Sequence, residues 1–228
     1  MDMNKKIEKI LFIEIILYII TKIIIFKLIL IKMIALGDRM KEYEHKNENR
    51  IKAYEPFLIR LDGNNFSKFT KGFKQPFDDN FVFSMIQTMN DLLTKFNART
   101  GYTHSDEITL IFDKICTKDE YDEDKSLVHN YNGRIEKILT LVSGYCSVRF
   151  NYYIKLYVNA DNKSYKTQFL DKINSDIVFF DARIIMPHGE FVNHMIWRSV
   201  CDCYRNCVAC FARKYFSAKK LHKKIQIK

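Results

Sequence analysis

Short apolar runs separated by polar turns predict the strands of this chain. Residues 57–61 and 108–112 are rich in Ile, Leu and Phe and have the length of buried strands. A third apolar run, 177–180, ends at Asp181, and residues 184–186 extend it toward a proline. Strands of this kind need helices to cover them, so the rest of the pattern decides the fold class.

Helical spacing of apolar residues occurs in the segments between these strands. Residues 77–99 and 133–150 predict two core helices, and residues 190–218 predict a long helical region with a basic end. The charged segment 38–51 reads as a solvated helix, whereas the acidic segment 116–133 reads as a flexible loop. The pattern therefore predicts an α+β fold, in which helices cover a sheet.

The N-terminal segment differs from everything that follows it. Residues 10–36 are almost wholly Ile, Leu and Phe, interrupted by single charged residues such as Glu14, Lys22 and Lys27. Transfer free energies make membrane insertion of residues 11–29 marginally favourable. Two interpretations stay open: residues 1–32 are a membrane segment, or they are a leader and the working domain, 33–228, begins at Met33.

Two acidic turns carry the candidate chemistry. The first apolar run stops at Asp62-Gly63, and Ser105-Asp106-Glu107 leads directly into the second. If the two strands are neighbours, Asp62 and Asp106 converge, and crowded carboxylates favour a bound Mg²⁺. Two such ions would support phosphoryl transfer, and Gly63 would let its backbone approach an ion closely. The plain alternative is that both segments are ordinary turns.

Phosphate and RNA are the partners that the remaining polar residues suggest. Residues 66–74 place hydroxyl and lysine side chains between aromatic ones, which suits either a triphosphate or an amphipathic turn of helix. The formal net charge of the 228-residue chain is +10, from 37 Lys and Arg against 27 Asp and Glu. This excess suits a polyanion such as RNA, although Lys-rich codon usage also explains it.

The six cysteines predict reduced thiols. Cys203, Cys207 and Cys210 fall at core-like helical spacing, while Cys201 points elsewhere, so a zinc cluster is the weaker interpretation. The spacing suggests no disulfide framework, which indicates a reducing compartment.

Several motifs in order resemble the tRNA(His) guanylyltransferase family. The first is residues 60–63 with 66–73 and 76–78, the second is 102–112, and the third joins 180–183 with Trp197-Arg198 and Arg205-Asn206. The resemblance covers about residues 36–224. It implies a palm-like polymerase domain with an antiparallel sheet, which adds nucleotides to the 5′ end of tRNA in the 3′-5′ direction.

The resemblance also implies roles for single residues. Asp62 and Asp106 would bind two Mg²⁺ ions, with the Gly63 backbone as a further ligand and Glu107 as a supporting carboxylate. The residues expected to contact the triphosphate are Lys71, Lys74 and Ser105, and the weaker candidates for RNA contact are Arg183, Arg198, Lys219 and Lys220. The implied partners are tRNA, GTP and ATP, and the implied assembly is a homotetramer. We expect the protein to be intracellular and cytoplasmic.

Four departures from the family pattern qualify this expectation. Asn64 stands where the family usually has Arg, and His104 where it usually has Gln. The Arg205-Asn206 form resembles the bacterial-type, Thg1-like branch, which is associated with repair of truncated tRNA 5′ ends. The chain ends at Lys228, earlier than is common in the family, so we expect a truncated C-terminus. A catalytically impaired RNA-binding remnant and a nucleotide cyclase of similar architecture are the alternatives.

Overall fold

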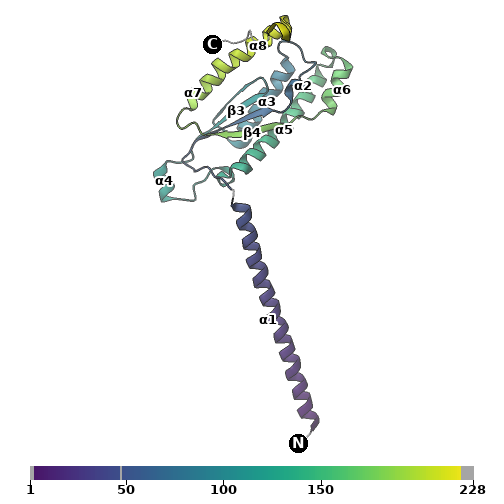
Figure 1. The fold of residues 1–228 in the computed structure, drawn as a ribbon, viewed down its shortest axis with the longest axis vertical. Helices are drawn as coiled ribbons and strands as arrows, with labels where there is room; N and C mark the ends of the chain where they lie inside the picture. The colour runs from purple at the N-terminus through teal and green to yellow at the C-terminus, as the bar shows by residue number, and fades with distance from the viewer. Residues whose placement is uncertain (1–2, 47, 222–228) are drawn as a thin grey trace. The chain divides into compact units, whose positions relative to one another are not determined.

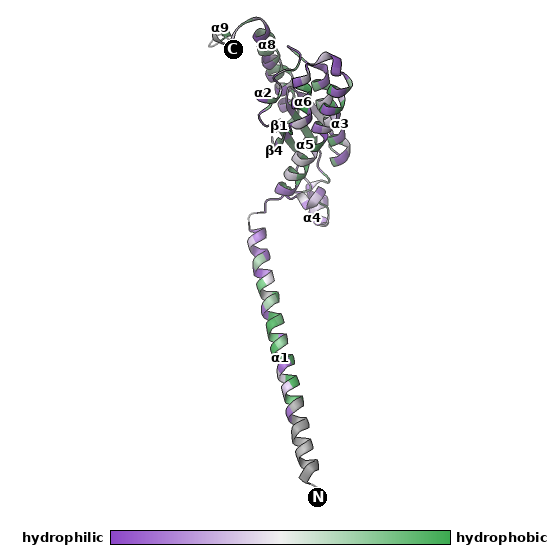
Figure 2. Ribbon diagram, turned by 90° about the vertical axis from the view of Figure 1, so that its right-hand side faces the viewer, coloured by the Kyte–Doolittle hydropathy of each residue, from purple (hydrophilic) through white to green (hydrophobic). Residues whose placement is uncertain are grey.

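The computed structural model describes residues 3–46 and 48–221, in two compact units, Met1–Glu48 and Asn49–Lys228. The first unit is a single helix, α1 (Met3–His45). It includes residues 38–45 of the segment 38–51, for which a separate helix was predicted. Its central turns are apolar on all sides, with isolated charged residues between them (Figure 2). Within the described residues, no helix combines the length and the apolar character that crossing a membrane requires.

A four-stranded antiparallel sheet forms the centre of the second unit, in the order β2-β3-β1-β4. Its strands are β1 (Phe57–Gly63), β2 (Thr100–His104), β3 (Glu107–Phe112) and β4 (Phe180–Ile185). The strands predicted from 57–61 and 108–112 are confirmed, and they are direct neighbours. The third predicted strand is confirmed with a later start, because β4 covers residues 180–185 and residues 177–179 lie outside it.

The alternation of side chains along β1 gives the sheet two different faces. Ile59 and Leu61 are fully buried and point into the apolar core, whereas Arg60 and Asp62 point to the opposite face. In the pairing with β3, Asp62 lies opposite Glu107, and in the pairing with β4 it lies opposite Asp181. Since directly paired residues share a face, the polar groups of three strands gather on one side.

Two long helices cover the apolar face of the sheet, as the sequence predicts. They are α3 (Asp79–Phe96) and α5 (Ile135–Ala160), which extends ten residues beyond the predicted helix over 133–150. The Asp78 side chain caps α3 by accepting hydrogen bonds from the backbone N–H groups of Asn80 and Phe81. Phe150 of α5 is fully buried among aromatic rings, including those of Phe66 and Phe180. This aromatic core fixes the segment after Asp62 against the sheet.

A second helical segment covers the polar face. It consists of α7 (Phe191–Ile196), the π-helix η3 (Trp197–Asp202) and α8 (Cys203–Tyr215), and it lies across the sheet from α5 (Figure 1). The long helix predicted over 190–218 is thus confirmed in outline, and α9 (Ala218–Leu221) follows it.

The remaining elements are short. They are α2 (Phe66–Phe69), α4 (Lys118–Glu123), η1 (Asn130–Gly133), η2 (Asn162–Ser164) and α6 (Thr167–Ser175). The segment 116–133, expected as a loop throughout, contains α4 because Thr117 and Glu120 form a capping box that stabilises one turn of helix.

Candidate active site

Two acidic turns meet at one edge of the sheet, at the end of β1. The Gly63 N–H donates a hydrogen bond to the Asp106 carbonyl over 3.1 Å, which ties the β2–β3 turn to the end of β1. In that turn Ser105 has a left-handed backbone (φ 52°), and its hydroxyl donates to an Asp106 carboxylate oxygen over 2.8 Å. The convergence of Asp62 and Asp106 is therefore confirmed.

Gly63 is required here by packing. A Cβ on Gly63 would lie 2.3 Å from the ring of Phe66, a distance that no real Cβ contact shows. Phe66 is itself buried in the aromatic core. The absence of a side chain thus allows the chain to turn tightly beneath Asp62.

The charge balance around Asp62 favours a bound cation. Partial burial and the nearby Asp106 carboxylate raise the pKa of Asp62, and Asp181, exposed on β4, adds to this effect. Arg183 compensates only in part, since its guanidinium lies 3.8 Å from Asp62 and 3.2 Å from Asp181. Crowded carboxylate oxygens at a partly open edge fit the hard ligand set that Mg²⁺ prefers. Asp62 and Asp106 are the residues that would hold such an ion.

Glu107 has a different environment from its neighbour Asp106. It pairs with two arginines, Arg60 of β1 and Arg198 of η3. Arg198 is 1% exposed and also pairs with Asp202, one helical turn further on. Glu107 therefore anchors the α7–η3–α8 segment to the polar face of the sheet. The sequence predicts Glu107 as a supporting carboxylate of the metal site, and the structure shows it in ion pairs with two arginines.

His104 completes this buried network. Its Nε2 lies 3.8 Å from Asp202 and 3.5 Å from the side-chain nitrogen of Asn206. Burial, followed by the positive charge of Arg198, lowers the pKa of His104, so the imidazole is neutral near pH 7. Within the described residues, His104, Glu107 and Asp202 are the one group of three metal-type ligands within 4.8 Å of one another. Because arginines already neutralise both carboxylates, a structural role accounts for this group.

A cavity of about 480 Å³ opens beside Asp106, within the usual size range of ligand pockets. Two of the residues predicted to contact phosphate, Ser105 and Lys74, line it. Lys74 also pairs with Asp161 over 3.2 Å, at the surface. The third, Lys71, is exposed and does not line this cavity.

The helix that closes the other side of the cavity carries the Arg205-Asn206 motif, but none of its residues was predicted to contact the nucleotide. Asn206 and Arg213 of α8 line the cavity, together with the half-buried thiols of the stripe formed by Cys203, Cys207 and Cys210. The prediction that this stripe is core was wrong, because α8 presents it to the cavity. The spacing at i, i+4 and i+7 identifies one helical face, and it does not say whether that face meets a core or a pocket.

The remaining site predictions concern RNA. Arg183 is half exposed beside Asp181, which leaves it available to a ligand. Arg198 needs a correction, because its burial between Glu107 and Asp202 removes it from any RNA surface. Lys220 is exposed, and the side chain of Lys219 lies outside the described part of the structure.

Sequence reasoning had not proposed Asp181 as a third carboxylate, although its place after an apolar run resembles that of Asp62.

Comparison with known proteins agrees with this geometry. The family model for tRNAHis guanylyltransferase (Thg1) matches residues 37–187. An uncharacterized protein of Acanthamoeba polyphaga mimivirus is 44% identical over 190 residues, which cover 82% of this chain and 65% of that protein. The chain thus spans less than two thirds of that relative's length.

Solved structures share the fold. A bacterial tRNA(His) guanylyltransferase (Thg1)-like protein in complex with ATP has a TM-score of 0.67 and 25% identity, covering 82% of this chain and 73% of that chain. The tRNA(His) guanylyltransferase from Saccharomyces cerevisiae, with a TM-score of 0.56 and 17% identity over 82% of this chain and 78% of that one, agrees in fold alone. With the family model matching well over half of its length, the chain belongs to the tRNAHis guanylyltransferase family.

Proposed function

We propose that this protein is an Mg²⁺-dependent nucleotidyltransferase that adds GTP or another nucleotide to the 5′ end of a tRNA, in the 3′-5′ direction. The observation that supports it best is the convergence of Asp62 and Asp106 beside a cavity of nucleotide size. The family membership and the ATP complex of the bacterial relative point the same way.

The residues of the site fall into those that would bind metal and those that contact the triphosphate. Asp62 and Asp106 would hold two Mg²⁺ ions, with the Gly63 backbone nearby, and such ions would supply charge stabilisation for the attacking and leaving oxygens. Ser105 and Lys74 orient the triphosphate in the cavity, and Arg213 adds a positive charge from α8. Lys71 contributes to the positive potential from the surface.

The reaction joins two substrates at the carboxylates. The tRNA carries a 5′ end that is triphosphorylated or has been activated by ATP. The 3′-hydroxyl oxygen of the incoming GTP attacks the 5′ phosphorus, a phosphodiester bond forms, and pyrophosphate or AMP leaves with the broken bond's electrons. The hydroxyl proton passes to solvent.

Labelled GTP and a tRNA that lacks its first nucleotide test this proposal. We expect a tRNA one nucleotide longer, formed only with Mg²⁺ present. A cyclic nucleotide as product would identify a cyclase, and tRNA binding without any product would identify an inactive remnant. Either of those two results would overturn the proposal. Parallel reactions with tRNA(His) and with other truncated tRNAs measure whether the enzyme prefers one acceptor or repairs many.

A further inference from the structure

A second cavity lies at the opposite end of the sheet from the carboxylates. Its volume is about 360 Å³, and it forms where β1 begins, β3 ends and the turn before β2 passes under η1. Since β1 has seven residues, the two cavities are separated by roughly 20 Å, the length of such a strand. The second cavity is therefore independent of the proposed nucleotide site.

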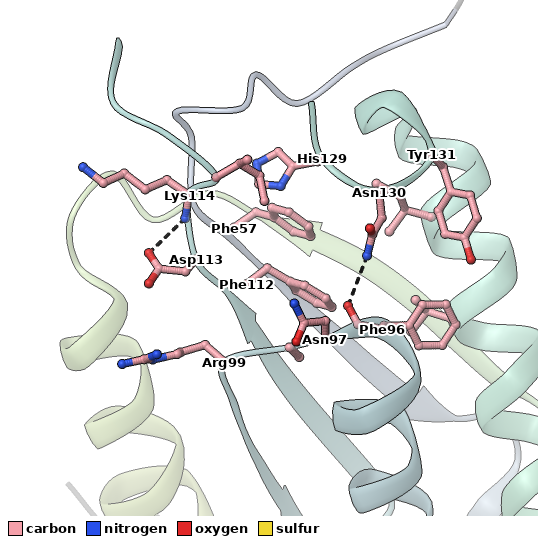
Figure 3. Close-up of a pocket in the computed structure, with 14 residues that line it drawn as sticks. Phe57, Phe96, Asn97, Arg99, Phe112, Asp113, Lys114, His129, Asn130 and Tyr131 are labelled. Atoms are coloured by element: carbon pink, nitrogen blue, oxygen red, sulfur yellow. Dashed lines mark hydrogen bonds between the residues drawn. The ribbon is translucent and has the colours of Figure 1, made fainter. Parts of the chain in front are cut away.

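Aromatic side chains form its walls. The rings of Phe57 and Phe112 stack with centroids 4.6 Å apart, and His129 meets Phe57 edge-on at 5.1 Å. His129 is held in place by a hydrogen bond between its Nε2 and the Glu55 carbonyl, and burial lowers its pKa, so it brings no charge. Tyr131, 38% exposed, closes the cavity on the side of α5 (Figure 3). Such walls suit a flat apolar group.

Two amides face the same space. Asn130 donates a hydrogen bond to the Phe96 carbonyl, which fixes the amide and leaves its oxygen as an acceptor (Figure 3). Asn97 has a left-handed backbone (φ 54°) at the end of α3, and its side chain makes no hydrogen bond within residues 3–46 and 48–221. A purely hydrocarbon ligand would leave the Asn130 oxygen and the Asn97 amide unpaired, at a cost in free energy. The ligand therefore has polar atoms around a flat body.

Positive charge marks the mouth of the cavity. Arg99 and Lys114 lie on the side of the aromatic rings away from Tyr131 (Figure 3). Neither forms an ion pair with a carboxylate among the described residues, and both are exposed. Asp113 lies between them and accepts a hydrogen bond from the Lys114 backbone, so the local balance is one positive charge. An anionic group attached to the flat body fits this mouth.

We propose that this second cavity binds a nucleobase whose attached phosphate contacts Arg99 and Lys114. Aromatic walls, amide groups and a cationic rim are the combination by which proteins hold an unstacked base. The source of the base is an unpaired nucleotide of the RNA substrate, which rests on the proposed function; a free nucleoside monophosphate offers the same chemistry. RNA bound here and at the carboxylates would be held at two points about one strand length apart.

Photo-crosslinking tests the site in the full-length protein. The probes are single-stranded RNA pentamers that contain 4-thiouridine, with unlabelled nucleoside monophosphates as competitors. We expect crosslinks within residues 96–99, 112–115 and 129–131, which line the second cavity, and we map them by residue because residues 104–106 line the first. Crosslinking that monophosphates abolish at low concentration identifies the free nucleotide as the natural source, and crosslinking that persists at high monophosphate concentration identifies the RNA. Absence of crosslinks from all three of these segments would overturn the proposal.

Two variants separate the base contact from the phosphate contact. Asn97→Gly removes an amide and keeps a residue that tolerates the left-handed backbone, so it should weaken pentamer binding about three- to tenfold without changing the melting temperature. The double change Arg99→Gln/Lys114→Gln should weaken binding and lower the salt slope by about one to two. Lys163→Gln/Lys166→Gln removes two exposed charges elsewhere and is the matched control.

Equal losses in the Arg99/Lys114 variant and in its control would mean a general charge effect and would contradict the specific site. These variants leave Asp62 and Asp106 intact, so nucleotide addition to a truncated tRNA reports on the proposed function separately. Addition without crosslinks refutes only the second site, and crosslinks without addition refute only the proposed function.

Discussion

Asp62 obtains its chemical character from neighbours that lie far apart in the sequence. Asp106 arrives from the β2–β3 turn and Asp181 from β4, and together with partial burial they raise the pKa of Asp62. Arg183 offsets only part of this negative charge, from a distance of 3.8 Å. Carboxylates that are ionised and close together repel one another, so this arrangement lowers the free energy of unfolding unless a cation lies between them.

The pH dependence of stability should reveal this repulsion. A raised pKa in the folded state means that Asp62 favours folding when protonated, and this contribution is lost as the pH rises through the raised pKa. Asp62→Asn should therefore increase the melting temperature of the metal-free protein near pH 7. The gain should shrink as the pH falls below the ordinary aspartate range, where Asp62 is protonated in both states.

Thermal unfolding in buffers that contain EDTA measures this difference. Saturating Mg²⁺ should reverse its sign, since only the wild-type side chain binds the ion and ligand binding stabilises the folded state. An Asp62→Asn protein that is less stable than wild type at neutral pH without metal would contradict the assignment.

At the scale of elements, the α7–η3–α8 segment is held to the sheet by buried ion pairs. Arg198, on the π-helix η3, contacts both Glu107 and Asp202 and is almost fully removed from solvent. π-helices are rare and often occur at functional sites. Here η3 places Arg198 against two carboxylates: Glu107, which lies on the sheet, and Asp202, which lies on η3 itself. The same segment carries Asn206 and Arg213 to the nucleotide cavity.

Removal of Arg198 should loosen this attachment. Arg198→Ala removes one cationic partner from each of two carboxylates. Glu107 keeps Arg60 and Asp202 keeps Arg205, so we expect a loss of about 1–3 kcal/mol in the free energy of unfolding. The triple variant Arg198→Met, Glu107→Gln, Asp202→Asn removes the charges together and should recover much of this loss. Urea denaturation measures both values. A loss below about 1 kcal/mol in Arg198→Ala would mean that the ion pairs contribute little to the fold.

Sequence patterns predict some of these elements better than others, for identifiable reasons. β1 and β3 follow from apolar runs that are buried, such as Ile59 and Leu110. β4 was shifted because Ile177 and Phe179 are apolar yet more than 60% exposed, outside the strand. β2 was missed because its sequence, Thr100–His104, is polar and lies at an edge. Asp106 could be found from its motif, whereas the burial of Arg198 depends on a tertiary contact that no local pattern contains.

At the scale of the whole molecule, the chain consists of two units with different organisation. The core cluster of buried apolar residues runs from Ile51 to Phe180, all within the second unit. In the first unit, α1 exposes large apolar side chains along its described length, among them Leu17, Phe26 and Ile31. The formal net charge of +10 belongs to the complete chain and suits a polyanionic substrate.

Deletion of residues 1–32 should leave the second unit's stability unchanged, because none of the described core residues is removed. We expect a melting temperature within about 2 °C of that of the full-length protein, which corresponds to less than about 1 kcal/mol for a domain of this size. Differential scanning calorimetry measures the transition. A drop of 10 °C or more would mean that α1 contributes packing that the second unit depends on.

Nucleotide addition by Asp62→Asn and Asp106→Asn, measured beside tRNA binding by the same proteins, tests whether the converging carboxylates are the catalytic centre. Each change removes a ligand of Mg²⁺ and keeps the size of the side chain, so we expect addition to fall at least a thousandfold while the Kd for tRNA changes less than threefold. Asp171→Asn, which changes an exposed aspartate of α6 that lines neither cavity, is the control and should retain normal addition. Ordinary Mg²⁺-dependent addition by both active-site variants would contradict the assignment of Asp62 and Asp106 as the metal-binding pair.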